Sequence, residues 1–273
     1  RKIFSGSEDC TIRVWDSKTG ALLAQLDGHA GAVTCVRVSP DGGVIASSSA
    51  DKTIRLWNPS DEFLRSLEGH EDRVTSLAFS KNGKRLVSVA LDKKLKVWDV
   101  ESGNLLDTLT GHDGYPVCLD FSPDGMLLAS TGADSNVIIW DISTARCYMQ
   151  GTIIALLGGH SDWVMDVAFS SDGALLTSGS RDRTVRVWDC AAAEKLKKAR
   201  FHSERCWSVA YSDDGMWLAS ASDDFKVRLW AVEGYAQVAA MEGHESEIRV
   251  VSFSPDDSLL ASAALDQTIR VWD

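Results

Sequence analysis

The sequence predicts an all-β fold assembled from seven copies of one unit, and three observations support this prediction. Tryptophan recurs at positions 15, 57, 98, 140, 188, 230 and 272, at intervals of 42, 41, 42, 48, 42 and 42 residues. A histidine, a serine and an aspartate recur in the same register. The segments between these fixed points have the pattern of four short strands separated by turns. Repeats of this length with four strands each are typical of β-propellers, so we predict seven blades of four-stranded antiparallel sheet.

The spacing inside each unit is stricter than the period. An aspartate follows each histidine by 22 residues, a serine stands four residues before that aspartate, and the tryptophan follows it by six. The first unit begins after its histidine position and contains Ser5, Asp9 and Trp15. The six complete sets are His29, Ser47, Asp51 and Trp57; His70, Ser88, Asp92 and Trp98; His112, Ser130, Asp134 and Trp140; His160, Ser178, Asp182 and Trp188; His202, Ser220, Asp224 and Trp230; and His244, Ser262, Asp266 and Trp272.

The strands of a unit are predicted from apolar runs bounded by turn residues. In the second unit the runs are Val33–Ser39, Val44–Ser48 and Thr53–Trp57, and the turn Pro40-Asp41-Gly42 separates the first two. A weaker fourth run follows the tryptophan, as in Leu105–Leu109. Short strands at this spacing are typical of sandwiches, barrels and propellers, and the sevenfold repeat selects the propeller.

The Gly-His pair, the Trp-Asp pair and the period of about 42 residues make the chain similar to the WD40-repeat family, over its whole length. The pair departs from Trp-Asp at Trp57-Asn58 and Trp230-Ala231, a position at which the family is tolerant. The resemblance implies that each blade runs from strand a at the central channel to strand d outside.

Mapped onto this scheme, the chain opens on strand b of one blade and ends on strand c of the seventh. It therefore has seven b and seven c strands but six a and six d strands. We expect residues 1–273 to form a single propeller domain and, because residue 1 is Arg, to be an excerpt of a longer chain. The closing a and d strands are expected in flanking sequence, since unpaired sheet edges favour aggregation.

The recurring Ser, His and Asp raise the alternative of a hydrolytic triad. A catalytic triad occurs once in a protein, whereas this set recurs in six complete units. In the family that the chain resembles, the His, Ser, Asp and Trp of a blade form a buried hydrogen-bond chain, and we expect that structural role. One histidine per blade leaves no second metal ligand at a suitable spacing, and no phosphate-binding glycine loop is present. We therefore predict no enzymatic activity, no cofactor and no metal.

Composition restricts the partners. The net charge is −11, whereas nucleic-acid binding is normally accompanied by a basic face. No apolar run is long enough to span a bilayer. The six cysteines form no C-x-x-C pair and are expected to be reduced. We expect an intracellular, cytoplasmic protein, with the nucleus as the alternative location, that binds protein or peptide rather than nucleic acid.

The residues that differ between units predict where a partner binds. The family binds partners mostly on the face made by the d–a loops and the b–c turns. There, two neighbouring units carry bulky and charged residues where another unit carries Ala32, Thr34 and Ala50. Trp, Tyr and Arg dominate binding hot spots, and arginine with aromatics suits an acidic or phosphorylated peptide. The alternative is packing beneath neighbouring loops. The predicted contact residues are Tyr115, Trp163, Met165, Arg181, Arg205, Trp207, Asp223 and Arg249.

Two segments break the pattern. Ser143–Thr152 carries an insertion of six residues, which we expect to be a surface loop. Ala191–Arg200 has the composition of a helix, but the repeat register predicts a turn and an outer strand d.

The sequence thus predicts a protein-interaction scaffold or adaptor that binds a partner on the top face of a propeller, within a larger signalling or regulatory protein or complex. A substrate-receptor subunit of a ubiquitin ligase is the alternative. An enzyme or a nucleic-acid-binding propeller are further alternatives, because a fold alone does not determine function.

Overall fold

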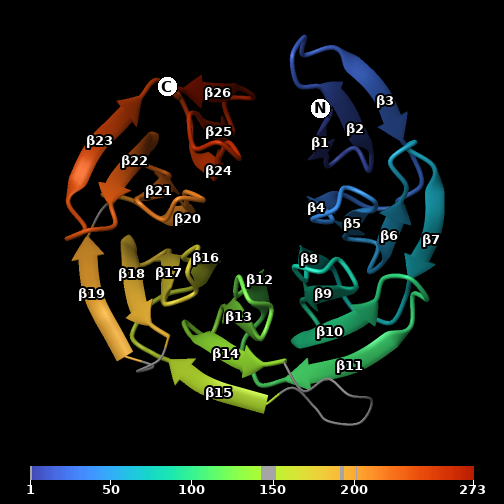
Figure 1. The fold of residues 1–273 in the computed structure, drawn as a ribbon, viewed down its shortest axis with the longest axis horizontal. Coiled ribbons are helices and arrows are strands. Elements are labelled where there is room, and N and C mark those ends of the chain that lie inside the picture. Colours follow the sequence, from blue (N-terminus) through green and yellow to red (C-terminus); the bar gives the residue numbers. More distant parts are fainter. Residues whose placement is uncertain (1, 143–151, 191–193, 201) are drawn as a thin grey trace. The chain divides into compact units, whose positions relative to one another are not determined.

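The computed structural model describes residues 2–142, 152–190, 194–200 and 202–273. Within these residues, 26 strands form seven antiparallel sheets without any helix, and the fold class is a seven-bladed β-propeller, as predicted (Figure 1). Two compact units divide the chain, the first built on residues up to Phe121 and the second on residues from Ser122.

The strands of the first unit are β1 (Lys2–Gly6), β2 (Ile12–Asp16), β3 (Leu22–Leu26), β4 (Val33–Val38), β5 (Ile45–Ser49), β6 (Ile54–Trp57), β7 (Phe63–Leu67), β8 (Val74–Phe79), β9 (Arg85–Ala90), β10 (Lys94–Asp99), β11 (Leu105–Thr110) and β12 (Pro116–Phe121). Those of the second unit are β13 (Leu127–Gly132), β14 (Val137–Asp141), β15 (Thr152–Leu157), β16 (Val164–Phe169), β17 (Leu175–Ser180), β18 (Thr184–Asp189), β19 (Glu194–Arg200), β20 (Cys206–Tyr211), β21 (Trp217–Ser222), β22 (Lys226–Ala231), β23 (Gln237–Glu242), β24 (Ile248–Phe253), β25 (Leu260–Ala264) and β26 (Ile269–Trp272).

Each sheet consists of strands that follow one another in the chain. The orders are β1-β2-β3, β4-β5-β6-β7, β8-β9-β10-β11, β12-β13-β14-β15, β16-β17-β18-β19, β20-β21-β22-β23 and β24-β25-β26. In the described residues the first sheet thus lacks strand a and the last lacks strand d, as the register predicts. The last strand leaves Ile269 and Val271 69% and 62% exposed. That flanking sequence supplies the two strands stays a prediction.

The hydrophobic core lies between neighbouring sheets rather than within one sheet. In the first unit, Ile54 and Leu67 of one sheet pack with Val74, Leu77 and Trp98 of the next. In the second unit, β14 and β15 share such a cluster with β16. Each sheet therefore buries its face only against its neighbours, as in other repeat proteins.

Polar contacts also join neighbouring inner strands. Within the first unit, the Thr34 hydroxyl donates to the carbonyl of Val74 at 2.6 Å. Within the second, the Val209 backbone N–H donates to Asp166 Oδ2 at 2.9 Å. These bonds satisfy backbone groups on strands that have no ladder partner on that side.

The turn between strands b and c requires an aspartate. In the second blade, Lys52 has a φ of 74°, which lies in the left-handed region and costs about 1–2 kcal/mol for a residue with a side chain. Asp51 offsets this cost, because its Oδ1 accepts hydrogen bonds from the backbone N–H and the hydroxyl of Thr53 at 2.9 and 2.7 Å. The residue after the turn aspartate has positive φ in all seven blades: Cys10, Lys52, Lys93, Ser135, Arg183, Phe225 and Gln267.

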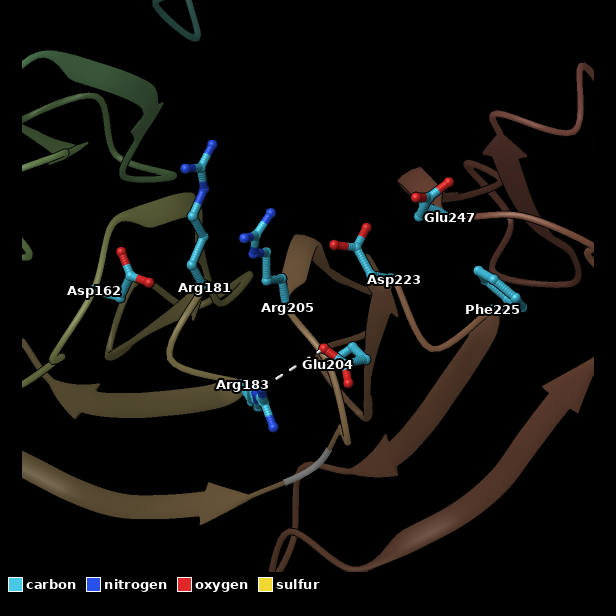
Figure 2. A pocket seen from close by; sticks show the side chains of 8 residues that line it. All are labelled: Asp162, Arg181, Arg183, Glu204, Arg205, Asp223, Phe225 and Glu247. Carbon is cyan, nitrogen blue, oxygen red and sulfur yellow. Dashed lines mark ion pairs between the residues drawn. The ribbon is translucent and has the colours of Figure 1, made fainter.

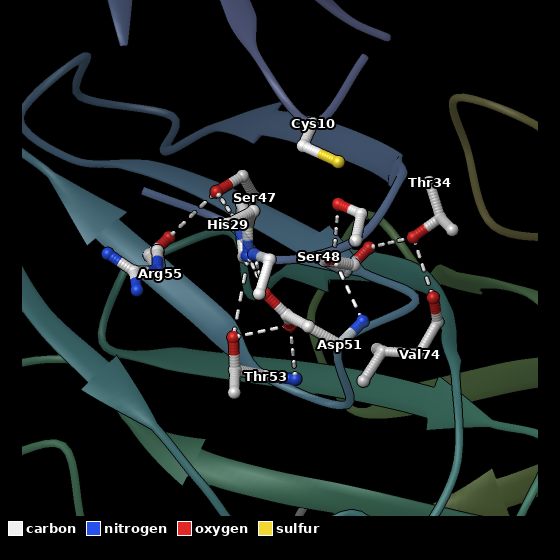
Figure 3. A network of polar contacts seen from close by, with 12 residues as sticks. Cys10, His29, Thr34, Ser47, Ser48, Asp51, Thr53, Arg55 and Val74 are labelled. Carbon is white, nitrogen blue, oxygen red and sulfur yellow. Dashed lines mark hydrogen bonds and ion pairs between the residues drawn. The ribbon is translucent and has the colours of Figure 1, made fainter. Parts of the chain in front are cut away.

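Behind this turn, the recurring histidine, serine, aspartate and tryptophan form one hydrogen-bond chain, which we call the repeat tetrad. Figure 3 shows His29, Ser47 and Asp51 of the second blade. In the second blade, His29 lies 2.9 Å from Asp51 through Nδ1 and 2.8 Å from Ser47 through Nε2. The Trp57 indole N–H donates to the Ser47 hydroxyl at 2.9 Å. The same contacts join the tetrads of His70, His160, His202 and His244.

The tetrad fixes the protonation of its histidine. A carboxylate only accepts, so His29 donates Nδ1–H to Asp51. The Ser47 hydroxyl accepts from Trp57 and has its own proton to donate to Nε2, which matches a neutral ring. Burial, which disfavours the charged ring, lowers the pKa of His29 and of His202 despite their aspartate partners. Burial alone would raise the pKa of Asp51, but hydrogen bonds from Thr53 and His29 outweigh it and lower that pKa to about 2.

The glycine before the histidine allows the chain to enter the blade. Gly28 has a φ of 144°, and a β-carbon there would stand 2.5 Å from Nη1 of Arg55. Gly159 is placed in the same way against Arg186.

Local helix propensity was the wrong guide to residues 194–200. They form β19, which pairs antiparallel with β18 in the register Val185↔Ala199, so the repeat register gave the correct prediction. The insertion predicted over Ser143–Thr152 lies, apart from its last residue, outside the described residues.

Replacing a tetrad residue should lower stability. In His160→Ala the carboxylate of Asp182 and the hydroxyl of Ser178 lose a buried partner, which costs about 2–3 kcal/mol. We expect a Tm lower by roughly 4–12 °C in calorimetry, since about 2–4 °C corresponds to each kcal/mol at this size. The exposed Glu101→Ala is the control. Equal melting of His160→Ala and the control would contradict a structural tetrad.

Acid should destabilise the fold in two stages. The pKa values of His29 and His202 lie below that of an unfolded-chain histidine, so the unfolded chain binds protons first as the pH falls through about 6.5. The pKa of Asp51 is about 2, below the value of about 4 in an unfolded chain, so a second loss follows between those values. Calorimetry should give a Tm that is constant above pH ~7.5, lower at pH ~5 and lower again at pH ~3. A Tm that stays level from pH ~7.5 to ~5 would refute the first stage.

Candidate functional site

The candidate site lies on the loops and turns of three successive sheets of the second unit. Trp163 directly precedes β16, Arg181 stands in the turn between β17 and β18, and Arg205 directly precedes β20. Trp207 is on β20 and Arg249 is on β24. Backbone bonds hold these segments together, since Arg181 N–H donates to the Trp163 carbonyl at 2.9 Å.

Four side chains alternate in a stack that we call the tryptophan–arginine ladder. The Arg181 guanidinium carbon lies 4.2 Å from the centre of the Trp163 ring and 5.2 Å from that of Trp207. The Arg249 guanidinium carbon also lies over the Trp207 ring, 3.8 Å from its centre. Each contact is within the range of a cation–π interaction, worth about 0.5–1 kcal/mol at exposed sites. The ladder therefore fixes two guanidinium groups against two half-buried indole rings.

Asp223 secures the far end of the ladder. Its Oδ1 accepts a hydrogen bond from the Trp207 indole N–H at 2.5 Å and lies 3.8 Å from Nη1 of Arg249. The Asp223 backbone N–H donates to the carbonyl of Arg205 at 3.0 Å. Asp223 thus orients the Trp207 ring and neutralises one arginine of the ladder.

Beside the ladder is a hollow of about 440 Å³ (Figure 2). Figure 2 shows Arg181 and Arg205 extending next to each other from two successive sheets, with the carboxylates of Asp223 and Glu247 beyond them. The hollow is lined by Asp162, Arg181, Arg183, Glu204, Arg205, Asp223, Phe225 and Glu247.

The charges around the hollow are unevenly paired. Arg183 pairs with Glu204 at 3.8 Å, and Arg249 with Asp223. Within the part of the chain that the structure describes, Arg181 and Arg205 form no ion pair, and Nε of Arg181 is buried without a hydrogen-bond acceptor. Burial and the nearby charge of Arg205 lower the pKa of Arg181, although it remains protonated near neutral pH. The site therefore holds two cations with unused hydrogen-bond donors.

The structure brings together most of the predicted contact residues. Trp163, Arg181, Trp207, Asp223 and Arg249 form the ladder and its anchor, and Arg205 lines the hollow beside them. Their role in binding stays a prediction.

Two predicted contact residues are not part of this arrangement. Met165 is half-buried on β16 and does not line the hollow. Tyr115 belongs to the first unit, where it is 44% exposed with Lys93 Nζ at 5.9 Å from its ring centre.

Sequence reasoning missed five residues that line the hollow: Asp162, Arg183, Glu204, Phe225 and Glu247. A signal existed for Glu247, which stands three residues after its histidine, like Trp163 and Arg205. Arg183 and Phe225 follow the turn aspartate, where positive φ directs the side chain differently from its neighbours.

The tetrads do not offer catalytic chemistry. The serines in all six complete tetrads are at most 1% exposed, so a substrate carbonyl has no access to their hydroxyls. In the described ranges no group of three histidine, cysteine or acidic side chains is arranged to hold a metal ion. Nor do those ranges contain a helix long and apolar enough to cross a bilayer.

Comparison with known proteins identifies the family. The pattern of the WD40 family, described as "WD domain, G-beta repeat", matches residues 1–16, 20–58, 61–99, 103–141, 151–189, 194–231 and 236–273. The chain therefore belongs to the WD40 family, as its resemblance implied.

Relatives match over short stretches. The chain is 52% identical over 56 residues to WD repeat-containing protein 26 homolog of Arabidopsis thaliana, which is 20% of this chain and 10% of that protein. It is 46% identical over 63 residues to nuclear distribution protein PAC1 of Arthroderma otae, or 22% and 14% of the two chains. It is 47% identical over 57 residues to guanine nucleotide-binding protein subunit beta-5b of Danio rerio, or 21% and 14%. The aligned stretches thus span only 10–14% of these relatives.

Proposed function

We propose that the chain is a protein-interaction module that binds a partner polypeptide at the tryptophan–arginine ladder and the adjoining hollow. The observation that carries this proposal is the ladder itself. It is built from residues that the repeat does not require, and it combines the residue types that dominate binding hot spots.

The equivalent positions of another blade show that the ladder is not needed for folding. Where the fifth blade has Trp163 and Arg181, the second has Ala32 and Ala50, with the same tetrad and the same turn. Stacking also holds the ladder side chains in place before a partner arrives. Binding then loses less side-chain entropy, which otherwise costs about 0.5–1.5 kcal/mol for each immobilised side chain.

The class of the chain supports an adaptor rather than an enzyme. WD40 propellers generally act as interaction scaffolds, and the relatives named above carry names without an enzymatic activity. The Ser, His and Asp sets that resemble a triad are buried in the tetrads. A place in a larger signalling or regulatory protein or complex agrees with the beta-subunit relative, whereas no observation favours a ubiquitin-ligase receptor.

A reducing compartment suits the cysteines. Among the described residues, Cys10, Cys35, Cys190 and Cys206 form no disulfide, and disulfides are rare in the cytosol and nucleus. We therefore place the protein in the cytoplasm, with the nucleus as the alternative.

Quantitative affinity capture from cell lysate tests the proposal. A Trp163→Ala, Trp207→Ala variant removes both aromatic faces of the ladder and should lose a defined set of partners. The Phe63→Ala variant is the matched control, because Phe63 is also half-exposed beneath an arginine, at 5.2 Å from Arg55, but belongs to β7 of the first unit and is not part of the ladder. Both variants are first shown to melt within a few degrees of the parent. Retention of every partner by the double variant would refute a binding site at the ladder.

A further inference from the structure

We propose that the hollow receives one phosphorylated side chain of the partner polypeptide, held between the guanidinium groups of Arg181 and Arg205. This inference rests on the proposed function and specifies the chemistry of its ligand.

The first step is the balance of charge. Of the arginines at the site, Arg183 and Arg249 each have an acidic partner. Arg181 and Arg205 have none among the described residues, although both line the same hollow. Two unpaired cations that lie near each other repel, and an anion placed between them removes that repulsion.

The second step is the direction of the donors. Arg181 has indole rings within 4.2 and 5.2 Å of its guanidinium carbon, which leaves the edge of the group to bind a ligand. A guanidinium edge offers a rigid fork of N–H donors suited to phosphate or carboxylate oxygens. Figure 2 shows the Arg181 and Arg205 groups extending in the same direction beside the hollow. The ladder thus presents the fork in a fixed orientation.

The third step distinguishes phosphate from carboxylate. A phosphorylated side chain has a charge of about −1.5 to −2 near neutral pH and three acceptor oxygens, whereas a carboxylate has one charge and two oxygens. Two guanidinium groups without partners match the former in both charge and donors. The hollow, about 440 Å³, has room for the phosphorylated side chain and part of the adjoining peptide.

The fourth step concerns the residues that flank the phosphate. Asp162, Glu204, Asp223 and Glu247 line the same hollow as the two arginines. A hydrogen bond from the Ser246 hydroxyl, at 2.6 Å, lowers the pKa of Glu247 and keeps it ionised. A run of acidic residues would be repelled by this border, so the ligand has a single phosphorylated residue with neutral or basic neighbours.

Binding of synthetic peptide libraries to the intact protein tests the inference. The libraries have phosphoserine, serine or glutamate at the centre, with random neutral and basic flanks, and a fourth has phosphoserine within acidic flanks. The phosphoserine library with neutral and basic flanks should bind at least about tenfold more tightly than the other three, since a charged hydrogen bond contributes about 1.5–3 kcal/mol.

Arginine variants locate the phosphate. Arg181→Gln and Arg205→Gln should each weaken binding by about tenfold or more. The matched control is Arg73→Gln, because Arg73 is exposed, stands three residues after its histidine like Arg205, and accepts the same backbone bond at its carbonyl. Arg205 is exposed, so its substitution serves as the test if Arg181→Gln does not fold.

Equal binding of the serine and phosphoserine libraries, or Arg205→Gln binding like the parent, would overturn the inference. Retention on anionic lipid vesicles without retention of any peptide would overturn it as well. Phosphatase treatment of the lysate distinguishes failure of this inference from failure of the proposed function. If the partners depend on Trp163 and Trp207 but survive phosphatase, the inference fails while the proposed function stands. If they depend on neither tryptophan, the proposed function itself fails.

Discussion

The bond on which the structure depends is the hydrogen bond from each repeat tryptophan to a buried serine hydroxyl, continued through histidine to aspartate. In the fifth blade, Trp188 of β18 donates to Ser178 of β17 at 2.9 Å. His160, before β16, contacts Ser178 and also Asp182, which stands in the turn after β17. This hydrogen-bond chain therefore ties two strands, the entering loop and the turn together, and its histidine, serine, aspartate and tryptophan side chains satisfy one another.

The same bonds position the candidate site. Arg181 directly precedes Asp182 and Asp223 directly precedes Asp224, while Trp163 and Arg205 each follow a tetrad histidine by three residues. The candidate residues thus project from backbone that the tetrads hold in one conformation, as preorganised binding requires. The tetrads recur from blade to blade, whereas the residues next to them differ between blades. Recognition chemistry can therefore change without loss of stability.

The sequence predicts the framework well because its signal is repeated. The strand register was correct even at residues 194–200, where local propensity favours a helix, because pairing with β18 outweighs propensity. The sequence predicts which residues form the ladder but not how their side chains stack. That Arg181 lies between two indole rings, and that Asp223 accepts from Trp207, depends on side-chain conformations that spacing does not encode. Asp162 and Glu204 were missed because acidic loop residues are common on any surface.

Exchange of the tryptophan indole protons with deuterated solvent, followed by NMR, tests most directly whether the tetrad holds each blade. The indole protons of Trp98, Trp140 and Trp188 should exchange far more slowly than that of Trp163, since these rings are at most 2% exposed and donate to buried serines. In Asp182→Ala the Trp188 proton should exchange faster, while that of Trp98 should not change. If Trp188 exchanged as fast as Trp163 in the parent protein, the tetrad would not be the constraint that holds the blade.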